Sequence, residues 1–238
     1  MIFGDFKSLV AAYLTREVES FTIGGIDLIL NAANHAKLDA QRLFDFPQLN
    51  GRAFIKVDAF GTNIANAKAA PRDDGAAVSV KKIHDGWKFV ANAEGTDWQR
   101  VQRYEPITEA DLHNIIPSLQ TALSEPNILP VSYKYRLYYS GNKVYLTGAV
   151  DASGSPAPAW VWLDVRLWST PYASDESTDF FLTDYSDWLL FKTIESLNFH
   201  LKEDQRVAIS ARFLQAKWDS VLAHAQSLNI ESGINTLD

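Results

Sequence analysis

Histidine is the first residue type to examine for chemistry, because imidazole is both a common base and a common metal ligand near neutral pH. None of the histidines has a second histidine or a carboxylate at the spacing of a known metal motif. We therefore predict no metal site, and structural or solvated roles for these side chains. The five are His35, His84, His113, His200 and His224.

Motifs for nucleophilic or phosphate chemistry are also lacking. Gly154 lies in the run GSPAP, which is not a nucleophile elbow, and Gly24-Gly25 lacks the Lys and Ser/Thr of a phosphate loop. The chain has no cysteine, which excludes thiol catalysis and thiolate metal sites. Nothing marks out a pair among the 29 acidic residues for glycoside hydrolysis. We predict a protein without catalytic residues and without a cofactor.

Acidic residues gather between positions 175 and 187, where they could in principle bind Ca²⁺. The segment lacks the alternating Asp/Asn spacing and the glycine of a calcium loop, so solvated and helix-capping roles fit it better. The functional alternative is a contact between subunits, in which Asp175, Glu176 and Asp179 meet basic residues of a neighbour.

Aromatic residues form the most distinctive surface that the sequence predicts. Alternation along a strand at 159–168 places Trp160, Trp162 and Trp168 on one side, opposite valines and leucines. If the neighbouring strands pair, Tyr138 and Tyr145 lie close to this face. It could pack under helices, meet a partner or bind carbohydrate. A carbohydrate-binding or other recognition module is therefore the alternative function for this chain.

The composition is that of a globular protein with excess negative charge. A chain of 238 residues, 47% of them hydrophobic, can bury a sizeable core. The net charge of -7 and the lack of Lys/Arg runs argue against tightly bound nucleic acid. No stretch approaches the roughly 18 apolar residues that span a bilayer, and the first residues are typical of a helix and not of a signal peptide. We expect a soluble protein with no membrane partner.

Helical patterns open and close the chain. Apolar residues at intervals of three and four predict helices at about 5–18, 26–44, 183–201 and 204–228. The third helix is apolar over most of its circumference, because Tyr185, Trp188, Leu189 and Phe199 lie outside its main stripe. Such a helix is normally buried on more than one side. We therefore predict that these four residues are central to a bundle or pack against another subunit.

Strand and turn patterns occupy the middle of the chain. A two-residue type II′ turn at Gly141-Asn142 would pair Tyr139 with Val144, and Tyr138 with Tyr145. That register leaves Tyr138 and Tyr145 on the face exposed to water or to a partner. Asp85-Gly86 is predicted as a second tight turn. Thr108 and Asp111 are spaced as in a capping box, which predicts a short helix at 108–116.

Together these patterns predict an α+β fold, in which N- and C-terminal helices form a helical bundle that carries an inserted antiparallel β-subdomain. The N-terminal helices occupy 1–48 and the β-subdomain 49–178. The C-terminal helices occupy 179–228, and a tail follows at 229–238.

Several blocks of the sequence, taken in order, resemble the head-to-tail adaptor proteins of tailed bacteriophages, also called neck, connector or head-completion proteins. The blocks are FGDFKSLVAAYLTREV, YEPITEADL, YYSGNKVYLTGAV, YASDESTDFFLTDYSDWLLF and KEDQRVAISARFLQAKWDSVLAHAQ. Their order and spacing match over most of the chain. The sequence departs from the family in a longer Gly- and Ala-rich region at 62–77 and an extended segment at 118–127.

The resemblance implies a structural virion protein, made in the host cytoplasm and located in the neck. Such proteins form a ring, usually of twelve copies, which joins the portal protein to a tail nozzle, stopper or tail-tube protein. Double-stranded DNA passes through the lumen without specific binding, and an acidic wall would repel its phosphates. By this resemblance the tail contacts the portal through Ile230, Ile234 and Leu237, and the aromatic face is offered to the tail side.

Overall fold

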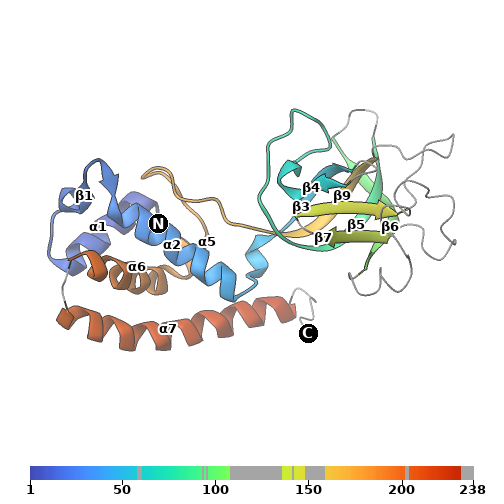
Figure 1. The fold of residues 1–238 in the computed structure, drawn as a ribbon. Helices are drawn as coiled ribbons and strands as arrows, with labels where there is room; N and C mark the ends of the chain where they lie inside the picture. Colours follow the sequence, from blue (N-terminus) through green and yellow to red (C-terminus); the bar gives the residue numbers. More distant parts are fainter. Residues whose placement is uncertain are drawn as a thin grey trace, which may run out of the picture. The chain divides into compact units, whose positions relative to one another are not determined.

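The computed structural model describes residues 1–57, 61–92, 94, 96–107, 136–140, 142–147, 159–201 and 204–231. The chain divides into two compact units, one of Met1–Gln48 with Ser169–Asp238 and one of Leu49–Trp168. Figure 1 shows the α-helices in the first and the seven-stranded sheet in the second. The sequence placed the second boundary at 178/179. Residues 169–178 instead belong to the helical unit, because they are hydrogen-bonded to its second helix.

In the helical unit, three helices pack around α6, which contacts α1, α2 and α7. The helices are α1 (Phe3–Leu14), α2 (Leu28–Leu43), α5 (Phe180–Asp184), α6 (Ser186–Leu201) and α7 (Asp204–Glu231). A 3-10 turn (Val18–Phe21) and a small hairpin of β1 (Thr22–Ile23) and β2 (Ile26–Asp27) join α1 to α2.

Local signals set the ends of these helices. Thr15 adopts a left-handed conformation and ends α1 at Leu14, earlier than the predicted Val18. Asp27 caps α2 by accepting a hydrogen bond from the Leu30 amide. Asp179 caps α5 in the same way, and Tyr185 separates α5 from α6 where one continuous helix was expected.

The helical core corrects the main argument for a subunit contact on the third predicted helix. Tyr185, Trp188 and Leu189 are only 4%, 5% and 0% exposed within this single chain. Because α6 is covered by α1, α2 and α7, no neighbouring molecule is needed to bury these three side chains. The Phe199 side chain lies outside the described part of the structure.

The second unit is built on one sheet whose strand order is β3-β9-β5-β6-β7-β8-β4. The bounds are β3 Asn50–Val57, β4 Thr62–Asn63, β5 Val80–Ala91, β6 Trp98–Ile107, β7 Arg136–Ser140, β8 Lys143–Thr147 and β9 Ala159–Leu167. Strand β3, at one end of this order, contacts β4 at the other end. The sheet is therefore nearly closed and barrel-like.

The predicted fold class is wrong. The structure is a mixed α/β fold dominated by this barrel-like sheet, and not a helical bundle with a small β insertion. The sheet is also not purely antiparallel, because β6 and β7 run parallel. Its interior is filled by alternate residues of the strands, among them Ile55, Val57, Leu137, Val144, Val161, Leu163 and Val165. Closure gives one sheet an enclosed core of its own.

The β7–β8 hairpin has the predicted register, with Tyr139 opposite Val144 and Tyr138 opposite Tyr145. The predicted turn type is wrong, because Asn142 has a φ of 65°, which a type I′ turn requires at this position and a type II′ turn does not. The predicted exposure of Tyr138 is also wrong. Tyr138 is 3% exposed and its ring lies against that of Tyr145.

Asp85-Gly86 is not a turn. Both residues lie inside β5, which shifts register against β9 just before Asp85. A Cβ at position 86 would lie 2.5 Å from Leu137 Cδ1, so the glycine allows Leu137 to enter the core. An isolated glycine in a strand can mark a bulge or a close approach of this kind. The predicted short helix at 108–116 lies outside the described residues.

We expect Gly86→Ala to destabilise the β unit by about 1–3 kcal/mol, because the added methyl group overpacks the buried Leu137 side chain. Leu137→Val shortens that side chain, so the double variant should lose less stability than the sum of the single variants. Urea unfolding of all four proteins tests this coupling. Additive losses would show that Leu137 is not the reason for the glycine.

Candidate functional site

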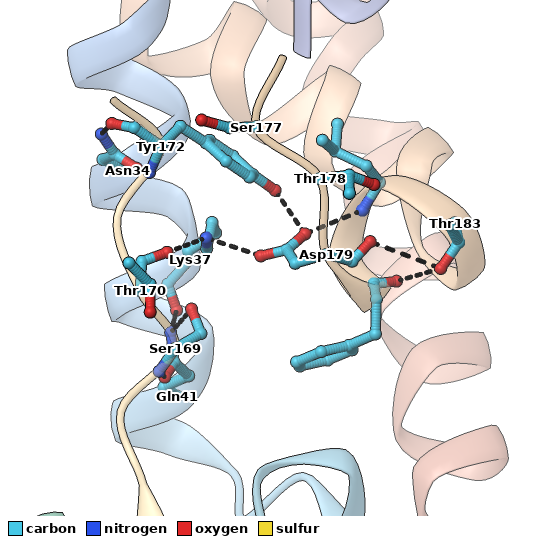
Figure 2. A network of polar contacts seen from close by, with 12 residues as sticks. Asn34, Lys37, Gln41, Ser169, Thr170, Tyr172, Ser177, Thr178, Asp179 and Thr183 are labelled. Carbon is cyan, nitrogen blue, oxygen red and sulfur yellow. Dashed lines mark hydrogen bonds and ion pairs between the residues drawn. The ribbon is translucent and has the colours of Figure 1, made fainter. Parts of the chain in front are cut away.

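The segment 169–179 runs along α2, and amide side chains of the helix hold its backbone (Figure 2). The Asn34 side chain accepts a hydrogen bond from the Tyr172 amide at 2.8 Å and donates to the Tyr172 carbonyl at 3.1 Å. Gln41 Oε1 accepts from the Ser169 amide at 2.7 Å. These contacts give an irregular stretch the backbone partners that a neighbouring strand would otherwise provide.

Lys37 lies at the centre of this network and is only 2% exposed. Its ammonium group donates to the Thr170 carbonyl at 2.8 Å and lies 2.6 Å from Asp179 Oδ2. It also lies 3.6 Å from the centre of the Tyr172 ring. The Tyr172 hydroxyl donates to Asp179 Oδ1 at 2.7 Å. Burial lowers the pKa of Lys37, although the charge of Asp179 opposes that shift.

The network holds the chain together and does not have the form of a reactive centre. Asp179 caps α5, as the preferred prediction for the acidic segment had it, and pairs with Lys37 in its own chain, which leaves the alternative subunit contact without its carboxylate. Asp175 pairs with Lys7 at 2.6 Å, although its side chain stays 60% exposed. Glu176 is exposed to solvent. Of the three predicted acidic residues, only Asp175 and Glu176 are therefore accessible to a partner.

Tyr172→Phe should remove the hydrogen bond to Asp179 while keeping the ring beside Lys37. We expect the free energy of unfolding to fall by about 1.5–3 kcal/mol near neutral pH, as for hydrogen bonds to charged groups. Burial and the Asp179 charge raise the pKa of Tyr172, so the folded protein keeps a proton that the unfolded chain loses near pH 10.

The contribution of Tyr172 should consequently be complete below about pH 10 and be lost as the pH rises further. The difference in stability between wild type and Tyr172→Phe should shrink by about 1.4 kcal/mol for each pH unit above that point. Urea unfolding at a series of pH values measures the difference. A constant difference up to about pH 11 would contradict the raised pKa.

A tryptophan–arginine ladder covers part of the outer face of the β unit. We use this name for Trp98, Arg52, Trp162, Arg100 and Trp87, in their order of contact. The Arg52 guanidinium lies 5.5 Å from the ring centres of both Trp98 and Trp162. The Arg100 guanidinium lies 5.5 Å from Trp162 and 4.9 Å from Trp87. Each arginine thus contacts two tryptophans in cation–π geometry.

Asp164 organises one end of this ladder. It accepts hydrogen bonds from the indole nitrogens of Trp162 at 2.9 Å and Trp87 at 3.2 Å, and from Arg100 Nη1 at 2.7 Å. At the other end the buried Phe54 ring packs against Trp98 and Trp162, at 5.0 and 5.5 Å. The ladder therefore fastens β5 and β6 to β9 and β3.

Of the three tryptophans predicted to form one aromatic face, only Trp162 belongs to the ladder. Trp160 is half-buried on β9, and the Trp168 ring packs against the Lys81 ammonium group. The sequence missed Arg52, Trp87, Trp98 and Arg100, which come from three other strands. In the structure β5 pairs with β9 so that Trp87 lies opposite Trp162. The sequence analysis placed a turn at Asp85-Gly86, which would end the strand before Trp87, and it therefore did not assign Trp87 to this face.

The ladder geometry does not favour the carbohydrate-binding alternative. Sugar platforms need tryptophan faces that are free to stack on a ring. The Trp162 ring already has guanidinium groups of Arg52 and Arg100 within 5.5 Å, and its indole nitrogen is bonded to Asp164. We do not propose that function further.

We expect Asp164→Ala to destabilise the β unit by about 1–3 kcal/mol, because two indole N–H groups and the Arg100 guanidinium lose their acceptor. The tryptophan fluorescence of the folded protein should change as well. Asp73→Ala is the matched control, since the Asp73 side chain is 82% exposed and its removal should cost less than about 0.5 kcal/mol. Equal stability of the two variants would contradict the assigned role of Asp164.

The helical unit carries an exposed aromatic row beside α7. Tyr13 on α1, Phe191 on α6 and Phe213 on α7 follow one another, with ring centres 5.8 and 5.5 Å apart. Tyr13 is 41% and Phe213 51% exposed, and Leu9 on α1 is 43% exposed. We call Tyr13, Phe191 and Phe213 the aromatic row. A contiguous apolar surface of this kind marks an interaction site more often than scattered apolar residues do.

A groove of about 530 Å³ lies where α2, α6 and α7 meet. Its apolar floor is formed by Trp188, Leu214 and Trp218, and Leu43 at its edge is 75% exposed. Two ion pairs line it, Arg42 with Asp39 and Lys192 with Glu195. The groove and the aromatic row both include residues of α6 and α7. The groove also includes residues of α2, and the row includes Tyr13 of α1.

A second hollow of about 310 Å³ lies between the start of α6 and α7. Asp187 there pairs with Lys217 at 2.6 Å, and the His224 ring lies 5.6 Å from that of Tyr185. The Ser227 hydroxyl donates to the His224 carbonyl at 2.7 Å and not to the imidazole, so this contact does not make the serine a nucleophile activated by His224.

Comparison with known protein families and proteins does not identify a family for this chain. Neither the protein-family models nor the curated proteins include a match to this chain. Over the described ranges, no three His, Cys, Asp or Glu side chains are grouped to hold a metal ion. The same ranges contain no helix that is long and apolar enough to cross a membrane. Ile230 lies on α7 without a described side chain, and Ile234 and Leu237 lie outside the described residues.

Proposed function

We propose that this chain is a structural subunit of a tailed-phage neck, in which copies form an adaptor ring between the portal and the tail. The proposal rests on the ordered sequence blocks that resemble that family. The role requires no catalytic group, and the resemblance implies about twelve copies, a portal partner and a tail nozzle, stopper or tail-tube partner.

The observation that supports ring formation best is the pair of apolar surfaces on the helical unit. The aromatic row projects Tyr13 and Phe213 into solvent, and the groove offers a hollow floored by Trp188 and Trp218. A chain with two different adhesive surfaces can associate head to tail, and such heterologous contacts close into rings when the rotation permits.

The distribution of charge supports the passage of DNA without specific binding. Residues 1–48 and 169–238 contain 9 Lys and Arg against 17 Asp and Glu. A lumen lined by surfaces of that composition would repel phosphate and hold no DNA in place. In this proposal the helical unit contributes the acidic wall of the channel.

Phe213→Asp should impair ring assembly. The side chain is 51% exposed, so the substitution should leave the fold intact while placing a charge within the aromatic row. We expect the protein to bind portal rings at least about tenfold less well, in the range of interface hot spots. Ile23→Asp is the matched control, because Ile23 is 61% exposed on β1, outside the row.

Negative-stain imaging of the protein mixed with portal rings from the same phage gives the readout. Wild type and Ile23→Asp should add a ring of density to the portal, and Phe213→Asp should not. A wild-type protein that adds no such ring, or that is absent from purified virions, would disprove the proposed function.

A further inference from the structure

The excess negative charge of this chain is confined to one of its two units. Residues 49–168 contain 13 Lys and Arg against 12 Asp and Glu, whereas the helical unit has 9 against 17. Between the helical units of two copies these charges repel, so an apolar contact of the aromatic row with the groove gains from a further attraction elsewhere. A contact between the β unit of one copy and the helical unit of the next avoids that repulsion and adds attraction.

The ladder places arginine where such a contact could use it. Arg52 is exposed and stacks on Trp98 and Trp162, and the described contacts give it no carboxylate partner. Arg100 is also exposed, but Asp164 already holds one of its nitrogens. Stacking on two rings fixes the Arg52 guanidinium, so little side-chain entropy remains to be lost when an anion binds.

Tryptophan and arginine are the residues that dominate the binding energy of protein interfaces. The outer face of the β unit carries them together. Arg52 helps to hold Trp98 against Trp162, but this stacking uses the face of the guanidinium and not its N–H groups. The contacts of Asp164 do not explain an exposed Arg52 without an acidic partner.

A matching acidic surface lies on the helical unit, around the N-terminal end of α1. The Gly4 amide donates to the Asp175 carbonyl at 2.9 Å, which sets the 175–176 turn beside the first turn of α1. Asp5, Asp175 and Glu176 are all exposed there. Lys7 partly neutralises Asp175, while Glu176 has no basic partner among the described contacts.

We propose that the ladder of one copy docks on the acidic 175–176 turn of a second copy, with Arg52 facing Glu176. This inference rests on the proposed ring and names one pair of surfaces that would hold neighbours together. Of the three acidic residues predicted to contact a neighbouring subunit, the proposal keeps Asp175 and Glu176. It excludes Asp179, whose carboxylate pairs with Lys37 and caps α5.

Charge reversal tests the contact in the isolated full-length protein. Arg52→Glu and Glu176→Arg should each weaken self-association at least about tenfold, because each juxtaposes like charges. Sedimentation velocity at low and high salt measures it, and the wild-type association should itself weaken as salt rises.

Mixing the two single variants is the decisive measurement. In a head-to-tail arrangement the mixture forms two attractive contacts, native Arg52 with native Glu176 and reversed Glu with reversed Arg. The mixture should therefore recover association that neither variant shows alone. A contact made within one copy cannot be rescued by mixing, so failure to recover would overturn the proposal.

Matched controls separate charge from folding. Lys143→Glu on β8 and Glu17→Arg after α1 reverse exposed charges elsewhere and should leave association unchanged. Arg52→Glu could loosen the ladder, so its thermal unfolding is compared with that of Arg52→Gln. Glu176→Arg avoids this ambiguity, because its site is exposed and has no role in the core.

Other outcomes point elsewhere. A wild-type protein that stays monomeric at the highest concentration reached would overturn the proposal. So would binding of a labelled single-stranded DNA oligonucleotide that Arg52→Glu abolishes and Glu176→Arg preserves, which would assign the ladder to nucleic acid. If both charge variants still form rings on the portal, the inference fails while the proposed function stands. If mixing the two variants restores association but no ring forms on the portal, the docking contact stands and the proposed function fails.

Discussion

A buried ammonium group determines how the helical unit is put together. Lys37 is 2% exposed, and removing a charge from water costs several kcal/mol unless partners replace the solvent. Its closest partners come from the 169–179 segment, namely the Thr170 carbonyl, the Tyr172 ring and the Asp179 carboxylate. That segment must therefore lie along α2. Asp179 is in turn the cap of α5, so the same charge also fixes where the C-terminal helices begin.

The β unit is constrained in a different way, by close packing inside and by polar contacts outside. Gly86 on β5 leaves room for the Leu137 side chain, which reaches it from β7. On the outer face Asp164 collects three donors from β5, β6 and β9. The contacts of Leu137 with Gly86, and of Trp87 and Arg100 with Asp164, join strands that are distant in the sequence. Such contacts close a sheet but leave little trace in local patterns.

The sequence predicted those elements that depend on local signals. The helices at both ends, the β7–β8 register and the strand at 159–168 follow from apolar spacing and turn length, and the structure has all of them. It failed where tertiary context decides. The run 98–107 carries polar residues on both faces and does not alternate, so β6 was not foreseen, and without it the sheet could not be recognised as nearly closed.

Only those residues of the candidate site that lie in a clear local pattern could be predicted from the sequence. Trp162 was singled out because its strand alternates clearly, while Arg52 and Arg100 are ordinary surface residues until β3, β9, β5 and β6 are set side by side. Of the two predicted explanations for the apolar circumference of α6, a central position among helices is confirmed and a contact with another subunit is not needed. Three helices of the same chain cover that helix, so Tyr185 and Trp188 need no second molecule.

The two places where the chain passes between units are each held by an amide side chain. Gln48 donates to the Tyr185 hydroxyl just before the β unit begins, and Gln41 binds Ser169 just after it ends. Both anchors lie within the helical unit and neither depends on what is threaded between them. The helical unit therefore keeps the two ends of the intervening 120 residues in place without any contribution from the sheet between them.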